Sequence, residues 1–372
     1  MHKKKIGILT LPLTNNYGGL LQSYALQFYL KNKGFDAIII DRRHNKSTLD
    51  NLKFLLKKYL FKGKYQLHLE NLKVTSNTRF FREKYLKPKT DEIFSQKKLK
   101  QIVDKEKFDA IIVGSDQVWR LEYSTDLFKN MFIDFINDKR VKKLSYAASF
   151  GLSDWHHDQL KTDIVRDLIN KFDYVSVRED SGLDICKTKF GIDSIQHIDP
   201  TMLLEIKDYK LLVDKEIGLK PQKGNILVYM LDNSEQRINL MNQIRDVVGG
   251  ELFYVNVESK SPKASLKQRT LPSVFNWVKG FMDAEYVIVD SFHGCVFAIL
   301  FNKPFIAFGN IKRGLTRFSS LLKLFKLEDR LILDVNELTP EIINAPINWK
   351  LTNSILEHCK KESDSYFENL FK

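Results

Sequence analysis

The chain has 372 residues and carries 59 Lys and Arg residues against 46 Asp and Glu residues, which gives a net charge of +13. Its three cysteines are widely spaced, which argues against a disulfide framework or a cysteine zinc site. No apolar stretch reaches the length of about 18 residues that predicts a transmembrane helix, and the positive charge favours anionic partners.

Short apolar runs alternate with helical patterns along most of the chain. The expected strands are Ile6–Thr10, Ala37–Ile40, Ala110–Val113, Lys143–Ala147, Tyr174–Val177 and Ser194–His197, followed by Asn225–Tyr229, Leu252–Val255, Tyr286–Val289, Pro304–Ala307 and Arg330–Leu333. The expected helices include Leu20–Asn32, Asp158–Lys171, Pro272–Met282 and Thr352–Phe371. Several strands are continuous Ile and Val runs, as is typical of parallel strands covered on both faces. The alternation predicts an α/β fold with doubly wound parallel sheets.

At about 150 residues per domain, the length predicts two domains. The polar stretch Lys207–Asn225 precedes a new series of strands and helices, so we place the boundary there. We expect a first Rossmann-like lobe over residues 1–206, on the acceptor side, and a second over residues 207–350, on the donor side. The last helix, within residues 351–372, is expected to pack back on the first lobe.

A Lys-rich insertion at about residues 51–100 departs from this alternation. Its first part, Leu52–Tyr65, interleaves apolar and lysine side chains in the sequence LKFLLKKYLFKGKY. One interpretation is a helix that lies on an anionic membrane face. The other is a solvated insertion whose apolar stripe packs on the first lobe.

The residues that follow each strand are candidates for chemistry, because ligands of doubly wound sheets lie outside the carboxyl ends of the strands. His293 stands after the Tyr286–Val289 strand, where an apolar helix begins. Free backbone N–H groups at such a helix start suit a phosphate or carboxylate, and Gly294 allows close approach to the backbone. An imidazole there can hold or deliver a proton. The alternative is a histidine that only caps the turn.

Cationic side chains follow two other strands. Arg178 ends the Tyr174–Val177 strand, where a guanidinium can bind a carboxylate or phosphate through two parallel hydrogen bonds, or else form a local ion pair. The loop Asn310–Arg317 brings Lys312, Arg313 and Arg317 together, either as part of an anion site or as a solvated basic loop.

Two loops of the first lobe are candidates for contact with a sugar. The first holds Asn16, Tyr17, Gly18 and Gly19 at the start of a helix, and the second holds Ser115, Asp116, Gln117 and Trp119. Carboxylate and amide groups can bind sugar hydroxyls, and an indole offers an apolar face to a sugar ring. Turn chemistry and a core tryptophan are the plain alternatives. The glycines match neither a dinucleotide fingerprint nor a phosphate-binding loop.

These segments together resemble the polysaccharide pyruvyl transferase family. The resemblance is carried by NNYGGLLQSYALQ, GSDQVW, SYAASFG, SVRED, HIDPTMLL and DSFHGCVFAILFNKPF, and it extends from about Lys5 to Leu333. It implies two Rossmann-like lobes in a GT-B-like arrangement with a cleft between them. It also implies a cytoplasmic transferase, at the inner face of the plasma membrane on the membrane interpretation, which forms pyruvyl ketals on a precursor of a surface glycan such as capsule or exopolysaccharide.

The resemblance implies phosphoenolpyruvate as co-substrate, a sugar or lipid-linked oligosaccharide as acceptor, and no metal or organic cofactor. Arg178 and His293 match the catalytic and donor-binding positions. Ser291 stands where relatives with an Arg-x-His motif have arginine, so the second donor cation falls to Arg313 or Arg317. Two alternatives stay open: a glycosyltransferase that uses a sugar nucleotide, and a non-catalytic glycan-binding relative, which Ser291 favours. No nucleic-acid motif accompanies the basic residues.

Overall fold

The computed structural model describes residues 3–45, 62–219, 221–232, 234–259, 261–309 and 314–371. They pack as two compact units. Unit 1 comprises Met1–Ala148, Gln159–Val175 and Val257–Val274, and unit 2 comprises Ser149–Asp158, Ser176–Asn256 and Phe275–Lys372. The chain therefore passes between the units several times.

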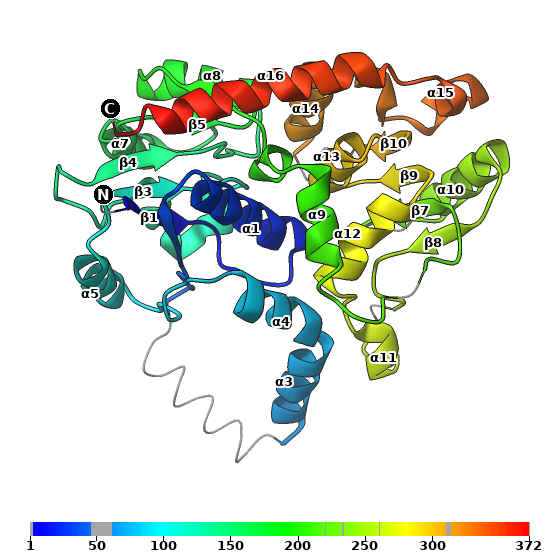
Figure 1. Ribbon diagram of the computed structural model, residues 1–372, viewed down its shortest axis with the longest axis horizontal. Coiled ribbons are helices and arrows are strands. Elements are labelled where there is room, and N and C mark those ends of the chain that lie inside the picture. The colour runs from blue at the N-terminus through cyan, green and yellow to red at the C-terminus, as the bar shows by residue number, and fades with distance from the viewer. Residues whose placement is uncertain are drawn as a thin grey trace. The chain divides into compact units, whose positions relative to one another are not determined.

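A parallel sheet of four strands forms the centre of unit 1 (Figure 1). Its strands are β1 (Lys5–Leu9), β2 (Asp36–Ile40), β3 (Ala110–Val113) and β4 (Lys142–Ser145), in the order β2-β1-β3-β4. Almost every strand residue is buried. Helices cover both faces of such a sheet, which explains the unbroken apolar runs. The helices of unit 1 are α1 (Tyr17–Asn32), α3 (Lys62–Val74), α4 (Ser76–Tyr85), α5 (Gln96–Glu106), α6 (Leu121–Ser124), α7 (Gln159–Ile169) and α11 (Leu266–Arg269), with short 3₁₀ turns η1 (Thr125–Leu127) and η2 (Asn130–Phe132).

Strand β1 marks the point where the order of this sheet reverses. Its neighbours β2 and β3 lie on opposite sides, so the connections that follow them run in opposite directions. The loops after β1 and β3 then separate, and a crevice opens at the carboxyl ends of these strands. This is where the sequence predicted a sugar contact.

Unit 2 is built on a second parallel sheet. Its strands are β7 (Ile226–Tyr229), β8 (Leu252–Tyr254), β9 (Tyr286–Val289), β10 (Phe305–Phe308) and β11 (Leu331–Ile332), in the order β11-β10-β9-β7-β8. A separate parallel pair joins β5 (Ser176–Val177) to β6 (Ile195–Gln196). The helices are α8 (Asp180–Ile185), α9 (Ile206–Val213), α10 (Glu235–Val248), α12 (Val274–Asp283), α13 (Phe292–Leu300), α14 (Thr316–Phe325), α15 (Pro340–Asn344) and α16 (Trp349–Glu368), with shorter turns at η3 (Cys186–Phe190), η4 (Pro200–Leu203), η6 (Glu328–Arg330) and η7 (Val335–Glu337).

The predicted fold class is confirmed: the protein is α/β with two parallel sheets. Each expected strand is present to within a few residues. Helix α1 begins at Tyr17 rather than Leu20, because the glycines before Leu20 already lie in the first helical turn.

The two units do not coincide with the expected division at residue 206. Residues 149–158 and 176–206, which we placed in the first lobe, belong to unit 2. Helix α16 contacts this segment: the ring centroids of Tyr366 and His197 are 4.8 Å apart, and the ammonium group of Lys360 is 2.7 Å from the Glu205 carboxylate. The helix thus reaches residues that we had assigned to the first lobe but that pack in the second unit.

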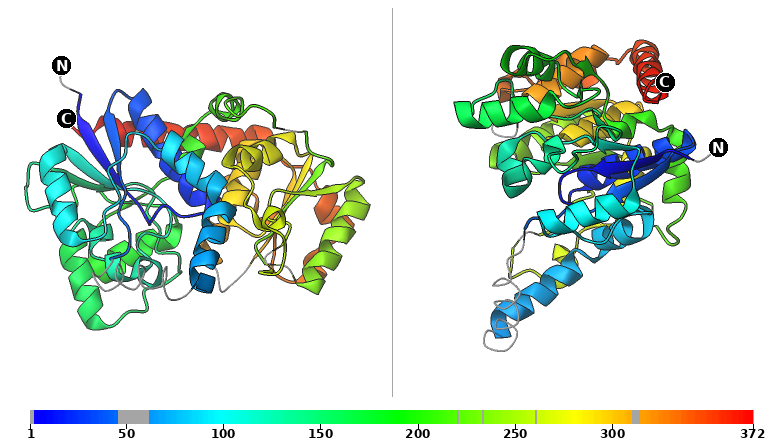
Figure 2. Two further views of the ribbon diagram at one scale, coloured as in Figure 1. Left: turned by 90° about the horizontal axis from the view of Figure 1, so that it is seen from below. Right: turned by 90° about the vertical axis from the view of Figure 1, so that its left-hand side faces the viewer.

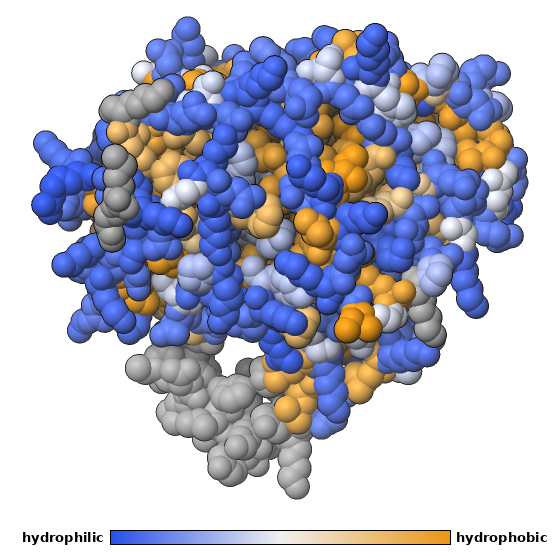
Figure 3. Space-filling model, viewed as in Figure 1, coloured by the Kyte–Doolittle hydropathy of each residue, from blue (hydrophilic) through white to orange (hydrophobic). Residues whose placement is uncertain are grey.

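The Lys-rich insertion is described only in part. Residues 46–61, which hold most of Leu52–Tyr65, lie outside the described residues, so the membrane interpretation stays a prediction. Helix α3 extends from α4 away from the sheet of unit 1 (Figures 1 and 2). Hydrophilic residues cover most of the face shown in Figure 3. Within the described ranges, no helix combines the length and the apolarity that a bilayer crossing requires.

Candidate functional site

The start of helix α13 is the centre of the first candidate site. Strand β9 ends at Val289, and Ser291 adopts the extended conformation of an N-cap residue. Its hydroxyl accepts a hydrogen bond of 3.0 Å from the Gly294 N–H, so the Ser291 side chain caps the helix. A Cβ atom on Gly294 would lie 2.7 Å from Val289 Cγ1 and 2.8 Å from Ser291 Oγ. Packing therefore requires glycine here.

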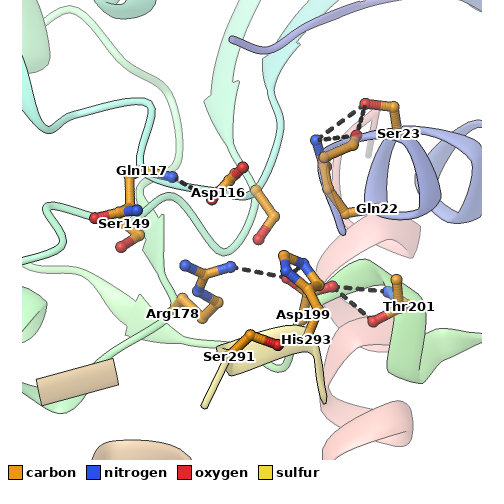
Figure 4. Close-up of polar contacts among 12 residues, drawn as sticks. Gln22, Ser23, Asp116, Gln117, Ser149, Arg178, Asp199, Thr201, Ser291 and His293 are labelled. Atoms are coloured by element: carbon orange, nitrogen blue, oxygen red, sulfur yellow. Dashed lines mark hydrogen bonds and ion pairs between the residues drawn. The ribbon is translucent and has the colours of Figure 1, made fainter. Parts of the chain in front are cut away.

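His293 and Arg178 meet at a shared carboxylate, that of Asp199 (Figure 4). The Arg178 guanidinium donates a hydrogen bond of 2.9 Å to Asp199 Oδ2, and His293 Nε2 lies 3.5 Å from the same oxygen. His293 comes from α13, Arg178 from the end of β5, and Asp199 from the turn before η4. The structure thus brings together the two residues predicted to be catalytic, and both belong to unit 2.

Asp199 remains ionised in this buried position. Burial alone would raise the pKa of its carboxyl group, but the charges of His293 and Arg178 and the hydrogen bonds from His293 and Thr201 hold the pKa well below its usual range. The Thr201 backbone N–H and hydroxyl both donate to the other oxygen, Oδ1. A fixed negative charge next to the imidazole can keep the ring of His293 in one orientation.

Two guanidinium groups flank the ring of Phe292. The Arg178 guanidinium carbon lies 4.1 Å from the ring centroid, and that of Arg317 lies 5.9 Å away. Arg317, one of the two residues predicted to provide a second cation, is buried beside this ring. Arg313 and Lys312 lie outside the described residues. Arg178 also makes an ion pair of 3.3 Å with Glu179, whose carboxylate accepts a hydrogen bond from the Ser149 hydroxyl.

In unit 2, hydrogen bonds and an ion pair between protein groups span the point where the order of the sheet reverses. The Asp290 carboxylate at the end of β9 accepts hydrogen bonds of 2.6 and 2.9 Å from the backbone N–H groups of Leu231 and Asp232, which follow β7. Arg237 adds an ion pair of 2.7 Å to the same carboxylate. These contacts connect the ends of β7 and β9. The groups predicted to bind an anion, Arg178, Arg317 and His293, lie instead around the start of α13.

A cavity of about 380 Å³ opens in unit 1 at the crevice beside β1. Its size falls in the range of about 300–1,000 Å³ that is usual for small-molecule sites. The walls come from the ends of the first three strands and the loops that follow them: Thr10, Leu11, Pro12, Leu13, Thr14, Asn16, Gly19, His44, Asp116, Glu122 and Tyr123. Asp116 has φ of +80°, a strained conformation for a residue other than glycine, of the kind that gathers at functional sites.

Three of the eight predicted acceptor residues line this cavity, namely Asn16, Gly19 and Asp116. Gln117 accepts a hydrogen bond from Arg120, and the hydroxyl of the buried Tyr17 donates to the Pro272 carbonyl. Gly18 and Ser115 are buried beside the walls.

Trp119 has no exposed surface, and its ring stacks on Phe132 at a centroid distance of 5.3 Å. Its predicted contact with a sugar is therefore not supported, because the apolar face of the indole belongs to the core.

Sequence reasoning missed several residues of these sites, among them Asp199, Glu179, His44, Glu122 and Tyr123. Asp199 lies in the HIDPTMLL motif directly after β6, a position that predicts a strand-end group, and Glu179 follows Arg178 in the chain. His44 and Tyr123 line the cavity of unit 1. His44 follows β2 at a distance that the strand pattern does not mark, and Tyr123 lies in the four-residue helix α6, which is too short to show periodicity.

The chain matches the profile of polysaccharide pyruvyl transferases over residues 16–312. It belongs to the polysaccharide pyruvyl transferase family. The matched range contains both candidate sites except for residues 10–14 and Arg317. The resemblance seen in the sequence motifs is confirmed. No curated protein matches the chain.

Solved structures are similar in fold to this polysaccharide pyruvyl transferase family member. The alignment with a Staphylococcus aureus MnaA–UDP complex covers 100% of this chain and 98% of the matched chain, at 12% identity and with a TM-score of 0.52. The UDP-N-acetylglucosamine 2-epimerase of Rickettsia bellii covers 99% and 98% at 12% identity, with a TM-score of 0.46. A Thermobaculum terrenum O-GlcNAc transferase covers 98% of this chain but 64% of its own length, at 9% identity and a TM-score of 0.43.

The family assignment establishes the kind of protein but not its substrates. A polysaccharide pyruvyl transferase is a transferase of polysaccharide biosynthesis. Among the residues that the structure describes, no three His, Cys, Asp or Glu side chains are grouped so that they could hold a metal ion. Cationic side chains and an imidazole lie around α13, and a cavity lined by polar and aromatic side chains lies in unit 1.

Proposed function

We propose that this protein transfers the pyruvyl group of phosphoenolpyruvate to hydroxyls of a sugar in a surface-glycan precursor, where it forms a ketal. The observation that carries this proposal is the cluster in unit 2, in which His293, Arg178 and the carboxylate of Asp199 meet beside a helix N-terminus. The cluster holds the cations and the proton carrier that a donor with a phosphate and a carboxylate needs.

The first step is donor binding. Arg178 and Arg317 place two positive charges on Phe292, the first residue of α13, and their charge compensates the carboxylate and the departing phosphate of the donor. Ser291 does not provide charge, since its hydroxyl is used as the helix cap. Relatives with an Arg-x-His motif have an arginine where this protein has Ser291. In this protein Arg317 supplies the positive charge of that arginine.

The second step is proton transfer from His293 to the methylene carbon of phosphoenolpyruvate, which turns the methylene into a methyl group. The neighbouring carbon becomes electrophilic, and an acceptor hydroxyl adds to it with loss of its proton. His293 regains a proton from an acceptor hydroxyl in each cycle, while the Asp199 carboxylate, 3.5 Å from Nε2, holds the imidazole in place.

The third step closes the ketal. The bond between the carbon and the phosphate oxygen breaks, phosphate leaves, and a second hydroxyl of the same sugar adds to the carbon. Of the two hydroxyl protons released, one replaces the proton given to the methyl carbon and the other leaves with phosphate, so the reaction balances without an oxidant. Asn16, Gly19 and Asp116 in the cavity of unit 1 are proposed to hold the acceptor.

An assay of phosphate release tests this proposal. With phosphoenolpyruvate and a panel of lipid-linked and nucleotide-linked sugars, we expect phosphate release and a product that mass spectrometry identifies as a pyruvyl ketal. His293→Gln removes the proton carrier and is expected to lower kcat by about a hundredfold or more. Arg317→Gln is expected to raise KM for phosphoenolpyruvate.

The matched controls are His358→Gln and Arg140→Gln, which change side chains that are 73% and 90% exposed. Both should retain full activity. If His293→Gln were as active as the native enzyme, the assignment of the acid would be lost. Transfer from a sugar nucleotide with no use of phosphoenolpyruvate would instead support the glycosyltransferase alternative, and sugar binding without any transfer would support a non-catalytic relative.

A further inference from the structure

The charge of the cavity in unit 1 contrasts with that of the whole chain. The protein carries a net charge of +13, yet among the residues that the structure describes, those that line the cavity include neither lysine nor arginine. Their ionisable members are the carboxylates of Asp116 and Glu122 and the imidazole of His44. Carboxylates accept hydrogen bonds from hydroxyl groups, but they repel phosphate and uronate groups. The cavity is therefore suited to an uncharged ligand rich in hydroxyls.

Tyr123 provides an aromatic surface in this cavity. It lines the wall and is 43% exposed, while the guanidinium carbon of Arg120 lies 4.4 Å from the centroid of its ring. Arg120 is itself fixed by a hydrogen bond of 3.0 Å to Gln117 and lies 3.7 Å from the Glu122 carboxylate. A cation held against the ring restrains its orientation, and the exposed part of the ring is left for an apolar face of a ligand.

His44 faces the cavity in a fixed orientation. Its Nδ1 lies 2.6 Å from Asp126 Oδ1, and Asp126 also accepts a hydrogen bond of 2.7 Å from the Asn45 backbone N–H. Burial raises the pKa of the Asp126 carboxyl, but the hydrogen bonds of His44, Asn45 and Thr125 outweigh burial and lower it. Because an ionised carboxylate can only accept, the Nδ1 that faces Asp126 carries a proton, and Nε2 is the ring nitrogen left for a ligand.

Behind the wall lies a polar group that the described residues leave unsatisfied. Gln22 is almost fully buried, and its side-chain N–H groups are directed to Thr10 and Gly19, both of which line the cavity, and to Ser23. Its Oε1 has no hydrogen-bond partner among the residues that the structure describes. The Gln22 amide thus holds Thr10 and Gly19, two residues of the cavity wall, from behind.

We propose that this cavity binds one uncharged sugar ring, which stacks on Tyr123 and gives hydroxyl hydrogen bonds to Asp116, Glu122 and His44 Nε2. This rests on the proposed function, in which unit 1 binds the acceptor, and it makes that acceptor more specific. The ring that receives the ketal is a neutral hexose or N-acetylhexosamine unit. It is neither a uronic acid nor a sugar phosphate. Tyr123 takes the stacking role that the sequence had assigned to Trp119.

Saturation-transfer NMR on the full-length protein without phosphoenolpyruvate tests this site independently of catalysis. The probes are the methyl glycosides of glucose, galactose, mannose and their N-acetylated forms, with methyl glucuronide and glucose 6-phosphate as charged counterparts. We expect at least one neutral glycoside to bind, and both charged probes to bind at least tenfold more weakly. Tyr123→Ala should weaken binding of the neutral probe about tenfold, and His44→Phe should weaken it as well, whereas Tyr123→Phe should retain it.

The matched control is Tyr254→Ala, which removes a tyrosine that is 53% exposed on β8 in unit 2 and should leave binding unchanged. Binding of the charged probes in preference, unchanged binding in Tyr123→Ala, or no binding of any neutral glycoside would each overturn the inference. Neutral-sugar binding at Tyr123 together with no phosphate release from phosphoenolpyruvate would uphold this site and reject the proposed reaction. Pyruvyl transfer to a uronate would do the reverse.

Discussion

His197 in unit 2 is a buried histidine next to which the structure places a hydroxyl and an aromatic ring. Its Nδ1 lies 2.7 Å from the Ser176 hydroxyl, and Tyr366 of α16 packs against its ring. Burial lowers the pKa of the imidazole to about 4, and a hydrogen bond with the Glu362 backbone offsets only part of that shift. His197 is therefore neutral in the folded protein at neutral pH.

This shift predicts that acid weakens the protein. Below pH 6.5 the unfolded chain gains a proton at His197, whereas the folded protein gains it only near pH 4. Stability from His197 is thus complete above pH 6.5 and is lost as the pH falls from 6.5 towards 4. By pH 5 the free energy of unfolding should fall by about 2 kcal/mol from this residue. Urea unfolding at pH 7.5 and pH 5 measures this loss.

A His197→Gln variant provides the comparison, because it cannot titrate. The difference between its unfolding free energies at the two pH values should be smaller than in the native protein, whatever its absolute stability. His358→Gln, which changes an exposed histidine of α16, should keep the native difference. An equal pH dependence in the native protein and in His197→Gln would show that the imidazole is not shielded as the structure indicates.

At the scale of single residues, strand-end positions were predictable where an apolar run marks the strand. His293 follows a strand of unbroken apolar character and Arg178 follows the mostly apolar run Tyr174–Val177, so their positions at strand ends could be read from the sequence. His44 and Tyr123 could not, because a short helix and a loop position them. Trp119 failed for a related reason: the sequence shows that an indole is present but not which of its faces the core covers.

Helix α13 shows how the packing of a helix restricts which residues its sequence can contain. All nine of its residues are buried, and its N-cap depends on the hydrogen bond from the Gly294 N–H to the Ser291 hydroxyl. The sequence indicated a glycine that permits ligand approach. The structure adds that the space at Gly294 is already filled by Val289 and Ser291.

Gly294→Ala is therefore expected to destabilise the protein by more than Ser291→Ala does. The added methyl group meets Val289 Cγ1 and the capping hydroxyl, so strain adds to the loss of the cap. Ser291→Ala removes only the cap, at a cost of about 1 kcal/mol. Thermal unfolding of the two variants compares them directly. If a Gly294→Ala variant were as stable as the native protein, the start of α13 would have space for a methyl group, which would contradict the packing described here.

At the scale of the whole molecule, the sheets were predictable but the grouping of segments was not. A polar stretch with proline and glycine marked a boundary near residue 207, because linkers share that composition. The segment just before it nevertheless packs on the last helix of the chain: the ring of Tyr366 lies against that of His197, and Lys360 pairs with Glu205. Such contacts between distant segments leave no periodic signal.

The grouping predicts how the chain responds to being divided at residue 206. A fragment of residues 207–372 would lack β5, β6 and η4, so that the buried partners of α13, α14 and α16 would be missing and their apolar faces exposed. A fragment of residues 1–206 would lack Val257–Val274, whose Leu271 N–H and Pro272 carbonyl bond to Val74 and Tyr17. Expressed alone, each fragment should aggregate or unfold without a cooperative transition in urea. Expressed together they should copurify, because each supplies what the other lacks, and cooperative unfolding of residues 207–372 alone would contradict the grouping.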